Sequence, residues 1–335
     1  MVNSVPVQTE EILAVKNLKK HFPVNHQLFK KGKEYLKAVD GVDLSVYKGE
    51  TLGIVGESGC GKSTLGNLIM GLLQPTEGEV YFNGVEISKM KERDLKKYRV
   101  DYQMIFQDPF SSLNPRMRVF DLIAEPLLTH KKLSRKELEV EVHRLMIDVG
   151  LDPSYTSRYP HEFSGGQRQR IGIARALALK PKLIICDEPV SALDVSIQAQ
   201  ILNLLDELQK KYDLTYIFIS HGLPALRHIS DRIGVMYLGN MVELATKEAL
   251  FKKPMHPYTN GLLASLPISD PRLRRADQDE VILEGDIPSP VDPPSGCKFH
   301  TRCPFAQEKC KMVVPEFEMR EEGHYVACHF PLHQE

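Results

Sequence analysis

The stretch 56–64, GESGCGKST, constrains this chain more than any other part of its 335 residues. It has the spacing G-x-x-x-x-G-K-S/T, follows the apolar run 52–55, and precedes a helical pattern. Glycines let backbone N–H groups approach phosphate oxygens, and the positive end of the following helix dipole favours the same anion. Lys62 is expected to reach the β- and γ-phosphates, and the Ser63 hydroxyl to ligate magnesium. The stretch predicts a nucleoside-triphosphate site, made by Gly56, Glu57, Ser58, Gly59, Cys60, Gly61, Lys62, Ser63 and Thr64.

Composition excludes several classes of protein. The formal net charge of −1 gives no support to a nucleic-acid partner. No apolar run approaches the roughly 18 residues of a transmembrane helix, and the polar start of the chain lacks the pattern of a signal peptide. The 42% hydrophobic and 26% charged residues predict a globular protein, and the lack of a signal-peptide pattern favours the cytosol.

Apolar strands that alternate with helical segments predict an α/β fold with a parallel-sheet core. An antiparallel β portion is expected near the start of the chain, from strands at 12–15 and 38–46 and from a hairpin across the dipeptide Asn83-Gly84. The lysine-rich segment 25–37 between the first two strands is expected to be a loop insertion.

Two changes of character suggest how the chain is divided. Between about 108 and 168 the strands give way to a helical subdomain, in which Ser134 and Glu137 form a capping-box start. From about Pro254 onward prolines gather, and a cysteine cluster follows. We therefore predict a main domain over 1–253 and a small appended domain over 254–335.

Two carboxylates, Asp187 and Glu188, end the apolar strand 183–186. By themselves they would suggest only a solvated strand end. Beside a phosphate loop, Asp187 is expected to hold magnesium through water and Glu188 to act as general base on the attacking water. Gln107 and His221 also end strands, at the edge of a parallel sheet where ligands bind. They are expected to sense the γ-phosphate and to complete the catalytic set, with Gln107 also counted with Ser63 and Asp187 as a magnesium ligand.

A second anion-binding corner is expected at the start of the helix that begins near residue 165, formed by Ser164, Gly165, Gly166 and Gln167. One nucleotide hardly needs two phosphate corners from the same subunit. A dimer, in which each copy offers its second corner to the nucleotide of the other, is the simplest solution.

Together these stretches resemble the ATP-binding subunits of ABC transporters over about residues 10–250. The resemblance identifies 56–64 as Walker A, 183–188 as Walker B, 164–168 as the signature, and 191–194, with Asp194, as the D-loop. It implies the ABC cassette fold, with ATP and Mg²⁺ as ligands and Asp194 near the nucleotide. Gln107 becomes the Q-loop glutamine and His221 the H-loop histidine.

Two positions depart from the family pattern or leave it open. Phe163 stands where the family usually has leucine, an apolar change that should not disturb function. The family stacks adenine on an aromatic residue upstream of Walker A. Phe22 matches that position best, and Tyr35 is the alternative.

The last part of the chain narrows the resemblance. The segments 256–259 and 262–267 resemble an extension found in peptide and nickel importer ATPases. A run of cysteines is similar to the cysteine segment of the oligopeptide and dipeptide subfamily, and it consists of Cys297, Cys303, Cys310 and Cys328. Such clustering in the cytosol favours metal over disulfides, and the spacing does not fit zinc-finger pairs. Four thiolates suit a 4Fe–4S cluster, which the resemblance implies. Zinc and unliganded thiols are the alternatives.

The resemblance implies an ATPase that powers import of oligopeptides or dipeptides. The alternatives are a soluble ABC-type ATPase not coupled to transport, and nickel import. Its implied partners are a second ABC ATPase subunit in a mixed dimer, two transmembrane permease subunits and, indirectly, an extracytoplasmic peptide-binding protein. The implied location is peripheral, at the cytoplasmic face of the membrane.

Overall fold

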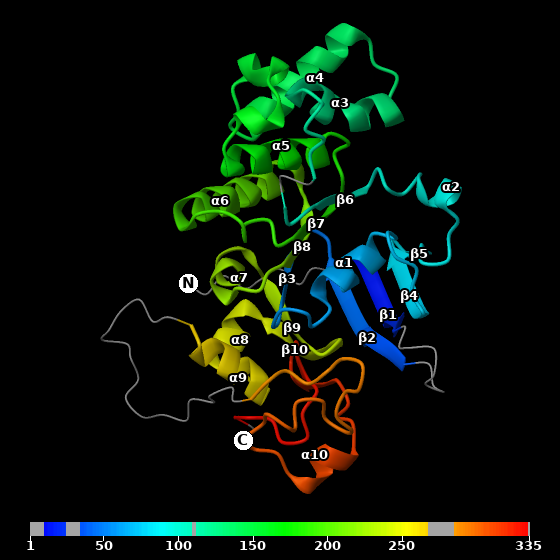
Figure 1. Ribbon diagram of the computed structural model, residues 1–335, viewed down its shortest axis with the longest axis vertical. Coiled ribbons are helices and arrows are strands. Elements are labelled where there is room, and N and C mark those ends of the chain that lie inside the picture. Colours follow the sequence, from blue (N-terminus) through cyan, green and yellow to red (C-terminus); the bar gives the residue numbers. More distant parts are fainter. Residues whose placement is uncertain (1–9, 25–33, 109–111, 267–284, 334–335) are drawn as a thin grey trace.

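A computed structural model describes residues 10–24, 34–108, 112–266 and 285–333 of the chain (Figure 1). Most of the predicted loop insertion, residues 25–33, lies outside this part, as do 109–111 of the helical subdomain and 267–284 of the appended domain. Among the described residues, no helix combines the length and hydrophobicity needed to span a bilayer.

The antiparallel β portion is a four-stranded sheet in the order β2-β1-β4-β5. Its strands are β1 (Glu11–Val24), β2 (Glu34–Tyr47), β4 (Glu77–Phe82) and β5 (Val85–Glu86). The hairpin predicted at Asn83-Gly84 is confirmed, because both residues have positive φ, 48° and 74°, as a primed turn requires. The first two strands are longer than predicted. Residues 34–37, expected in a loop, pair with the end of β1.

The parallel core lies in an eight-stranded sheet of the order β11-β12-β10-β9-β3-β8-β7-β6. Five of its strands run parallel, as predicted: β3 (Thr51–Val55), β6 (Tyr102–Ile105), β7 (Leu183–Asp187), β8 (Thr215–Ile219) and β9 (Arg232–Tyr237). Three antiparallel strands extend it beyond β9: β10 (Asn240–Thr246), β12 (His324–Val326) and β11 (Glu318–Glu321).

Both faces of the central strands β3, β7 and β8 are buried, which explains their continuous apolar runs. Side chains alternate between the faces along a strand. Tyr216 and Phe218 of β8 join the core that packs against the helices, whereas Ile217 and Ile219 join the core shared with the four-stranded sheet. The sheet thus fixes where its strands end, and the loops after those strand ends come together at one edge.

Some of the helices pack around the sheet, and others form a separate arm (Figure 1). They are α1 (Lys62–Ile69), α2 (Glu92–Leu95), α3 (Val119–His130), α4 (Arg135–Asp148), α5 (Gly165–Leu177), α6 (Val195–Tyr212), α7 (Leu223–Ile229), α8 (Lys247–Lys252), α9 (Pro257–Ala264) and α10 (Glu308–Met312). The arm contains α3 and α4, and α4 begins with the predicted capping box at Ser134.

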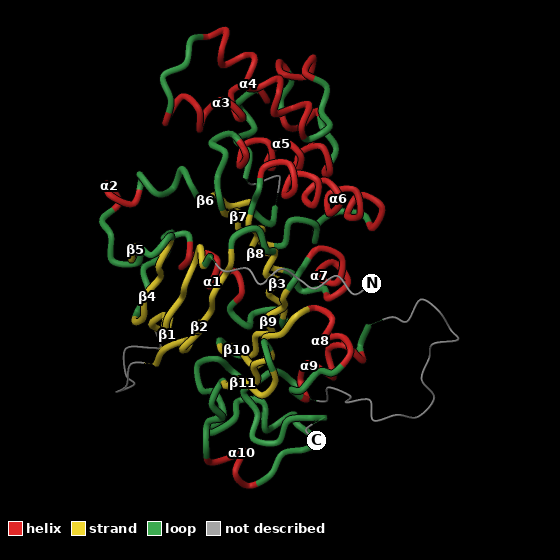
Figure 2. Tube along the Cα trace, turned by 180° about the vertical axis from the view of Figure 1, so that it is seen from behind, coloured by secondary structure: helices red, strands yellow, loops and turns green. Residues whose placement is uncertain are grey.

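The part of the chain after residue 284 consists mostly of loops (Figure 2). It is joined to the main sheet, because β12 pairs with β10 and β11 pairs with β12. Glu243 of β10 is fully buried and holds this junction together. Its carboxylate accepts hydrogen bonds from the backbone N–H groups of Met255 (2.7 Å) and His256 (3.0 Å), and from His324 Nε2 (2.7 Å). The domain boundary near 254 stays a prediction, and the chain beyond it packs on the cassette as part of one structure.

Candidate nucleotide-binding site

A cavity of about 770 Å³ opens at the edge where β3, β7 and β8 end. It brings together the phosphate loop, residues that follow the ends of three further strands, β6, β7 and β8, and part of the four-stranded sheet. Its lining residues are Phe22, Leu36, Ala38, Gly56, Glu57, Ser58, Gly59, Gly61, Lys62, Ser63, Thr64, Gln107, Glu188, His221 and Leu262. Most residues predicted from the Walker A, Q-loop, Walker B and H-loop stretches therefore lie on one cavity.

The phosphate loop passes too close to neighbouring backbone for side chains at two of its glycines. A Cβ atom at Gly61 would lie 2.0 Å from the carbonyl oxygen of Ala38, and one at Gly56 would lie 2.2 Å from that of Met236. Gly61 also has φ of 106°, a conformation that residues with side chains rarely adopt. The loop leads directly into α1, whose N-terminus faces the same cavity.

Lys62 is 4% exposed and its ammonium is held inside the loop. Its Nζ donates to the carbonyl oxygens of Gly56 (2.7 Å) and Glu57 (3.1 Å). A buried ammonium needs such partners, and phosphate oxygens would be stronger ones. The lysine is thus stored in a position from which it can turn to an incoming phosphate.

Asp187 and Ser63 place two oxygen ligands side by side. The Ser63 hydroxyl donates to Asp187 Oδ1 at 2.9 Å, and Asp187 is 7% exposed. Burial raises the pKa of the Asp187 carboxyl above its ordinary value, while the Ser63 hydrogen bond opposes the rise. A buried carboxylate beside a hydroxyl is a suitable oxygen donor set for Mg²⁺, whose charge would favour the ionised form.

Glu188 lies at the centre of a small polar group. Its Oε2 accepts from Gln107 Nε2 at 2.9 Å and lies 3.1 Å from His221 Nδ1. Its φ of 48° is unusual for a residue with a side chain, and such strain persists only where the surroundings hold it. Here the Glu188 N–H donates to the carbonyl of Ile219 (2.9 Å), and the Ser191 N–H donates to the Glu188 carbonyl (3.2 Å). Together these contacts fix the direction of the Glu188 carboxylate.

The two aromatic residues expected as candidates for stacking on adenine differ in position. Phe22, near the end of β1, lines the cavity, whereas Tyr35 of β2 is not among its lining residues. Leu262 of α9 also lines it, although the sequence analysis assigned it no nucleotide contact. Only a tertiary contact brings this part of the chain to the phosphate loop, so no local pattern could have indicated it.

The signature residues do not line this cavity in a single copy of the chain. Ser164 caps α5 in a capping box. Its backbone N–H donates to Gln167 Oε1 (3.0 Å), and its Oγ accepts from the Gln167 N–H (3.4 Å). Gly166 has no room for a side chain, because a Cβ would lie 2.5 Å from Ile197. Asp194 precedes α6 and makes no side-chain cap there. The start of α5 thus lies away from the nucleotide cavity, and its expected role as a second anion-binding corner stays a prediction.

The four C-terminal cysteines come together from separate segments around one cavity of only about 10 Å³. Burial raises the pKa of Cys303 to about 11 and that of Cys328 to about 12, so both thiols are neutral there. Within the part of the chain that the structure describes, no group of three or more His, Cys, Asp or Glu side chains is placed to hold a metal ion. The predicted metal-binding extension is therefore not supported, because the thiols converge on packed side chains rather than on an open site.

Comparisons with known proteins agree with this geometry. Residues 39–191 match the model of the ABC transporter family, and residues 242–310 match that of the oligopeptide/dipeptide transporter C-terminal region. The chain is 55% identical to the oligopeptide transport ATP-binding protein AppF of Bacillus subtilis, over 96% of this chain and 97% of that protein. It is 53% identical to the oligopeptide transport ATP-binding protein OppF of Salmonella typhimurium, over 98% of each.

Solved structures resemble the cassette part. The dimeric structure of MJ0796, a bacterial ABC transporter cassette, aligns with a TM-score of 0.63 and 30% identity, covering 70% of this chain and 99% of that one. With near full-length similarity at this level of identity, the chain belongs to the ABC transporter family, among the ATP-binding subunits of oligopeptide and dipeptide transporters.

Proposed function

We propose that this chain is the ATP-hydrolysing subunit that powers import of oligopeptides or dipeptides through partner permeases. The observation that carries the proposal is the combination of near full-length similarity to oligopeptide transport ATP-binding proteins with a cavity that collects the phosphate loop, Gln107, Glu188 and His221. Reconstitution with the matching permeases tests it. ATP-dependent uptake of labelled peptides is expected. Uptake of nickel but not of peptide would show that nickel is the cargo. ATPase activity that never responds to the permeases would favour an ATPase not coupled to transport.

In the proposed mechanism the residues of the cavity divide the work. Lys62 exchanges its carbonyl partners for the β- and γ-phosphates. Glu188, already oriented by Gln107, accepts a proton from the attacking water, and His221 lies close enough to orient the same carboxylate or the γ-phosphate. Ser63, Asp187 and Gln107 would hold magnesium, which supplies charge neutralisation on the phosphates when bound.

The signature corner is proposed to serve the nucleotide of a second ATPase subunit. Ser164, Gly165 and Gly166 form a helix start that does not line the nucleotide cavity of the same copy. Such a helix start offers N–H groups and a positive dipole end to the phosphates of a facing nucleotide. Asp194 would lie near the same junction. A dimer of two different ATPases, bound at the cytoplasmic face of the membrane, is our proposal for the assembly.

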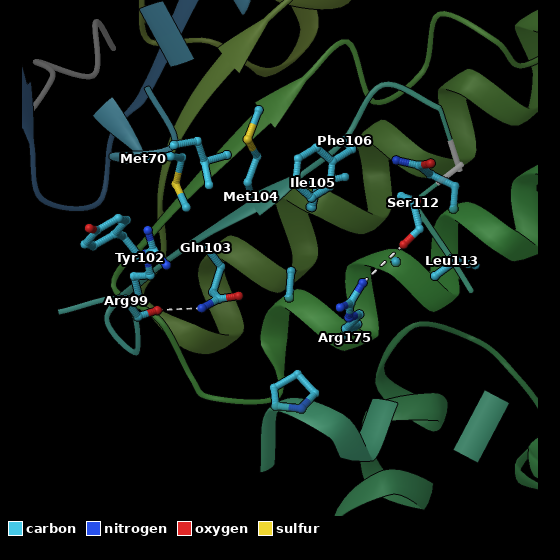
Figure 3. Close-up of a pocket in the computed structure, with 15 residues that line it drawn as sticks. Met70, Arg99, Tyr102, Gln103, Met104, Ile105, Phe106, Ser112, Leu113 and Arg175 are labelled. Carbon is cyan, nitrogen blue, oxygen red and sulfur yellow. Dashed lines mark hydrogen bonds between the residues drawn. The ribbon is translucent and has the colours of Figure 1, made fainter. Parts of the chain in front are cut away.

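A second cavity, of about 210 Å³, lies between β6 and α5 and is proposed as the permease-docking site (Figure 3). It is bordered by exposed apolar side chains, among them Leu72 (48% exposed) and Phe106 (44% exposed). Arg175 of α5 closes one end by donating to the carbonyl oxygen of Ser112 at 3.2 Å. An apolar hollow that borders the Q-loop Gln107 would let a permease helix sense the state of the nucleotide.

This docking proposal can be tested with matched surface variants. Leu72→Asp should abolish co-purification with the permeases while leaving ATP binding intact, because a carboxylate cannot be buried in an apolar contact without cost. Leu128→Asp is the control, since Leu128 is 60% exposed on α3 and does not line the cavity. Equal retention of the permeases by both variants would reject this site.

For the C-terminal cysteines, we propose a 4Fe–4S cluster of structural purpose. The proposal rests on the run of four cysteines and its resemblance to the oligopeptide and dipeptide subfamily, because the described residues form no metal site. The cavity of about 10 Å³ is too small for a cluster, so the thiols would have to separate when one is inserted. Protein purified without air should be brown, with near-equal iron and sulfide. Colourless protein with one stoichiometric zinc would overturn the proposal.

A further inference from the structure

Glu57 of the phosphate loop is held by three groups, two of which come from the C-terminal part of the chain. Its carboxylate accepts hydrogen bonds from both terminal nitrogens of Arg302, at 2.8 and 3.0 Å. Its backbone N–H donates to the Tyr258 hydroxyl at 2.9 Å. Its carbonyl accepts from Lys62 Nζ at 3.1 Å. Glu57, whose carbonyl holds Lys62, is thus hydrogen-bonded to Tyr258 and Arg302, about 200 and 245 positions further along the chain.

The two C-terminal groups are rigidly placed. His256 caps α9 by accepting from the Tyr258 N–H at 3.0 Å, and the His256 N–H is bound by the buried Glu243. The Tyr258 ring packs against Tyr237 and Phe299, with ring centroids 4.7 and 5.4 Å apart. Both neighbouring rings and Tyr258 itself are almost fully buried. A hydroxyl carried by such a ring holds its hydrogen-bond partner in one position.

Arg302 is equally well fixed. Its side chain is 5% exposed, and its guanidinium lies over the Tyr237 ring at 5.9 Å. The hydrogen bonds to Glu57 raise the pKa of Arg302 above its ordinary value. Arg302 immediately precedes Cys303, so the packing of the cysteine loop also sets the position of the guanidinium.

The charge of Glu57 explains why such a partner is needed. Glu57 lines the nucleotide cavity, and a carboxylate there repels the phosphates of ATP. At 23% exposure its side chain is only partly screened by water. A bidentate guanidinium neutralises the carboxylate and fixes its direction at the same time.

We propose that Arg302 and Tyr258 are positioning residues for the phosphate loop, through which the C-terminal extension sets the affinity of the cassette for ATP. Arg302 cancels the charge of Glu57, and Tyr258 fixes the peptide whose carbonyl holds Lys62. Neither residue lines the nucleotide cavity itself. The inference rests on the proposed nucleotide site and adds a dependence of that site on the extension.

Equilibrium ATP binding by the full chain tests the charge role of Arg302. Arg302→Gln should weaken ATP binding about tenfold, because Glu57 is then left uncompensated. Glu57→Gln alone should strengthen binding, and the double variant should recover most of the loss. The loss in Arg302→Gln should be smaller for ADP, which carries less charge. Arg302→Lys should restore part of the affinity, since it keeps the charge without the bidentate geometry.

Tyr258→Phe tests the second contact without removing the ring. It should weaken ATP binding two- to tenfold, the range for loss of one hydrogen bond. Thermal unfolding of each variant shows whether the extension still folds. If the double variant binds ATP as poorly as Arg302→Gln, the charge role is overturned and Arg302 only supports the fold. Lys62→Ala tests the nucleotide site separately from the role of the extension. Unchanged ATP binding in that variant would reject the nucleotide site itself.

Discussion

The nucleotide cavity and the cysteine cavity are both built from segments far apart in the sequence, yet they differ in volume and in the side chains that line them. The nucleotide cavity measures about 770 Å³ and is lined by glycines and by polar groups at strand ends. The cysteine cavity measures about 10 Å³ and is lined by aromatic rings as well as thiols, among them those of Phe299, Phe305 and Phe330. One is open to a ligand, and the other is closed by packing.

The residues that line the two cavities are held in place by different interactions. Glu188 and Asp187 are carried by a buried strand, so backbone hydrogen bonds of the sheet orient them whether or not a ligand is present. Three of the cysteines lie in loops and Cys310 lies in the short helix α10, so their positions depend mainly on side-chain packing. A group bound there would have to form part of the fold as it assembles rather than enter a prepared cavity.

The largest effect is expected from Glu188→Gln, which tests whether the open cavity is organised for catalysis. Loss of the general base should lower ATP hydrolysis about 10²- to 10⁴-fold while ATP still binds with magnesium. The variant should accumulate as an ATP-bound dimer. Steady-state turnover and size-exclusion chromatography measure the two effects. Near-normal turnover would remove Glu188 from this role.

The next effect concerns the corner that lies away from the cavity. Ser164→Arg should prevent ATP-driven dimerisation, because a bulky cation replaces the cap of α5 at the surface offered to the second subunit. ATP binding by the isolated chain should change little. Analytical ultracentrifugation with the Glu188→Gln background gives the dimer fraction. A large loss of ATP binding by the monomer would place Ser164 in the cavity of its own chain.

Cys303→Ser is expected to have a smaller effect, confined to the closed cavity. Removal of one ligand of the proposed cluster should bleach the anaerobic protein. It should also lower the unfolding temperature by several degrees, because a small loop-rich unit would depend on the cluster as its cross-link. Val313→Ser, an exposed change in the same extension, is the control. An equal shift in the two variants would show that the cysteines pack only as small apolar side chains.

The smallest effect is a pH dependence at the junction between the two regions. Burial lowers the pKa of His256 to about 4, whereas the unfolded chain titrates near 6.5. The unfolded state therefore binds more protons below pH 6.5, so stability falls as the pH drops from about 6.5 to about 4, by on the order of 3 kcal/mol at most. Below that window both states are protonated and His256 adds no further loss.

His256→Asn sharpens this prediction, since asparagine also caps helices but does not titrate. Urea unfolding at several pH values should show a flatter pH dependence in the variant than in the unaltered chain. His143→Asn on the exposed side of α4 is the control. An unchanged pH profile in His256→Asn would show that His256 is not the source of the acid sensitivity.

Much of the nucleotide site could be predicted because its parts are local. The spacing of 56–64 by itself requires a loop that ends in a helix, and the apolar run 183–186 requires a buried strand with carboxylates at its end. The Asn83-Gly84 turn was predicted for the same reason, since only residues that tolerate positive φ fit it. The loop insertion was placed too broadly, because residues 34–37 form strand only by pairing with β1.

The chemistry of each segment, and the local conformation that presents it, follow from residue types and short-range spacing alone. Which segments meet was decided by the tertiary structure. β12 joins the main sheet beside β10 although some 80 residues separate them, and Arg302 meets Glu57 across 245 positions. No periodicity encodes such contacts, because they arise from burial of side chains on surfaces that exist only after the sheet has formed. Local spacing therefore predicted the phosphate loop, and only the assembled fold placed the C-terminal extension against it.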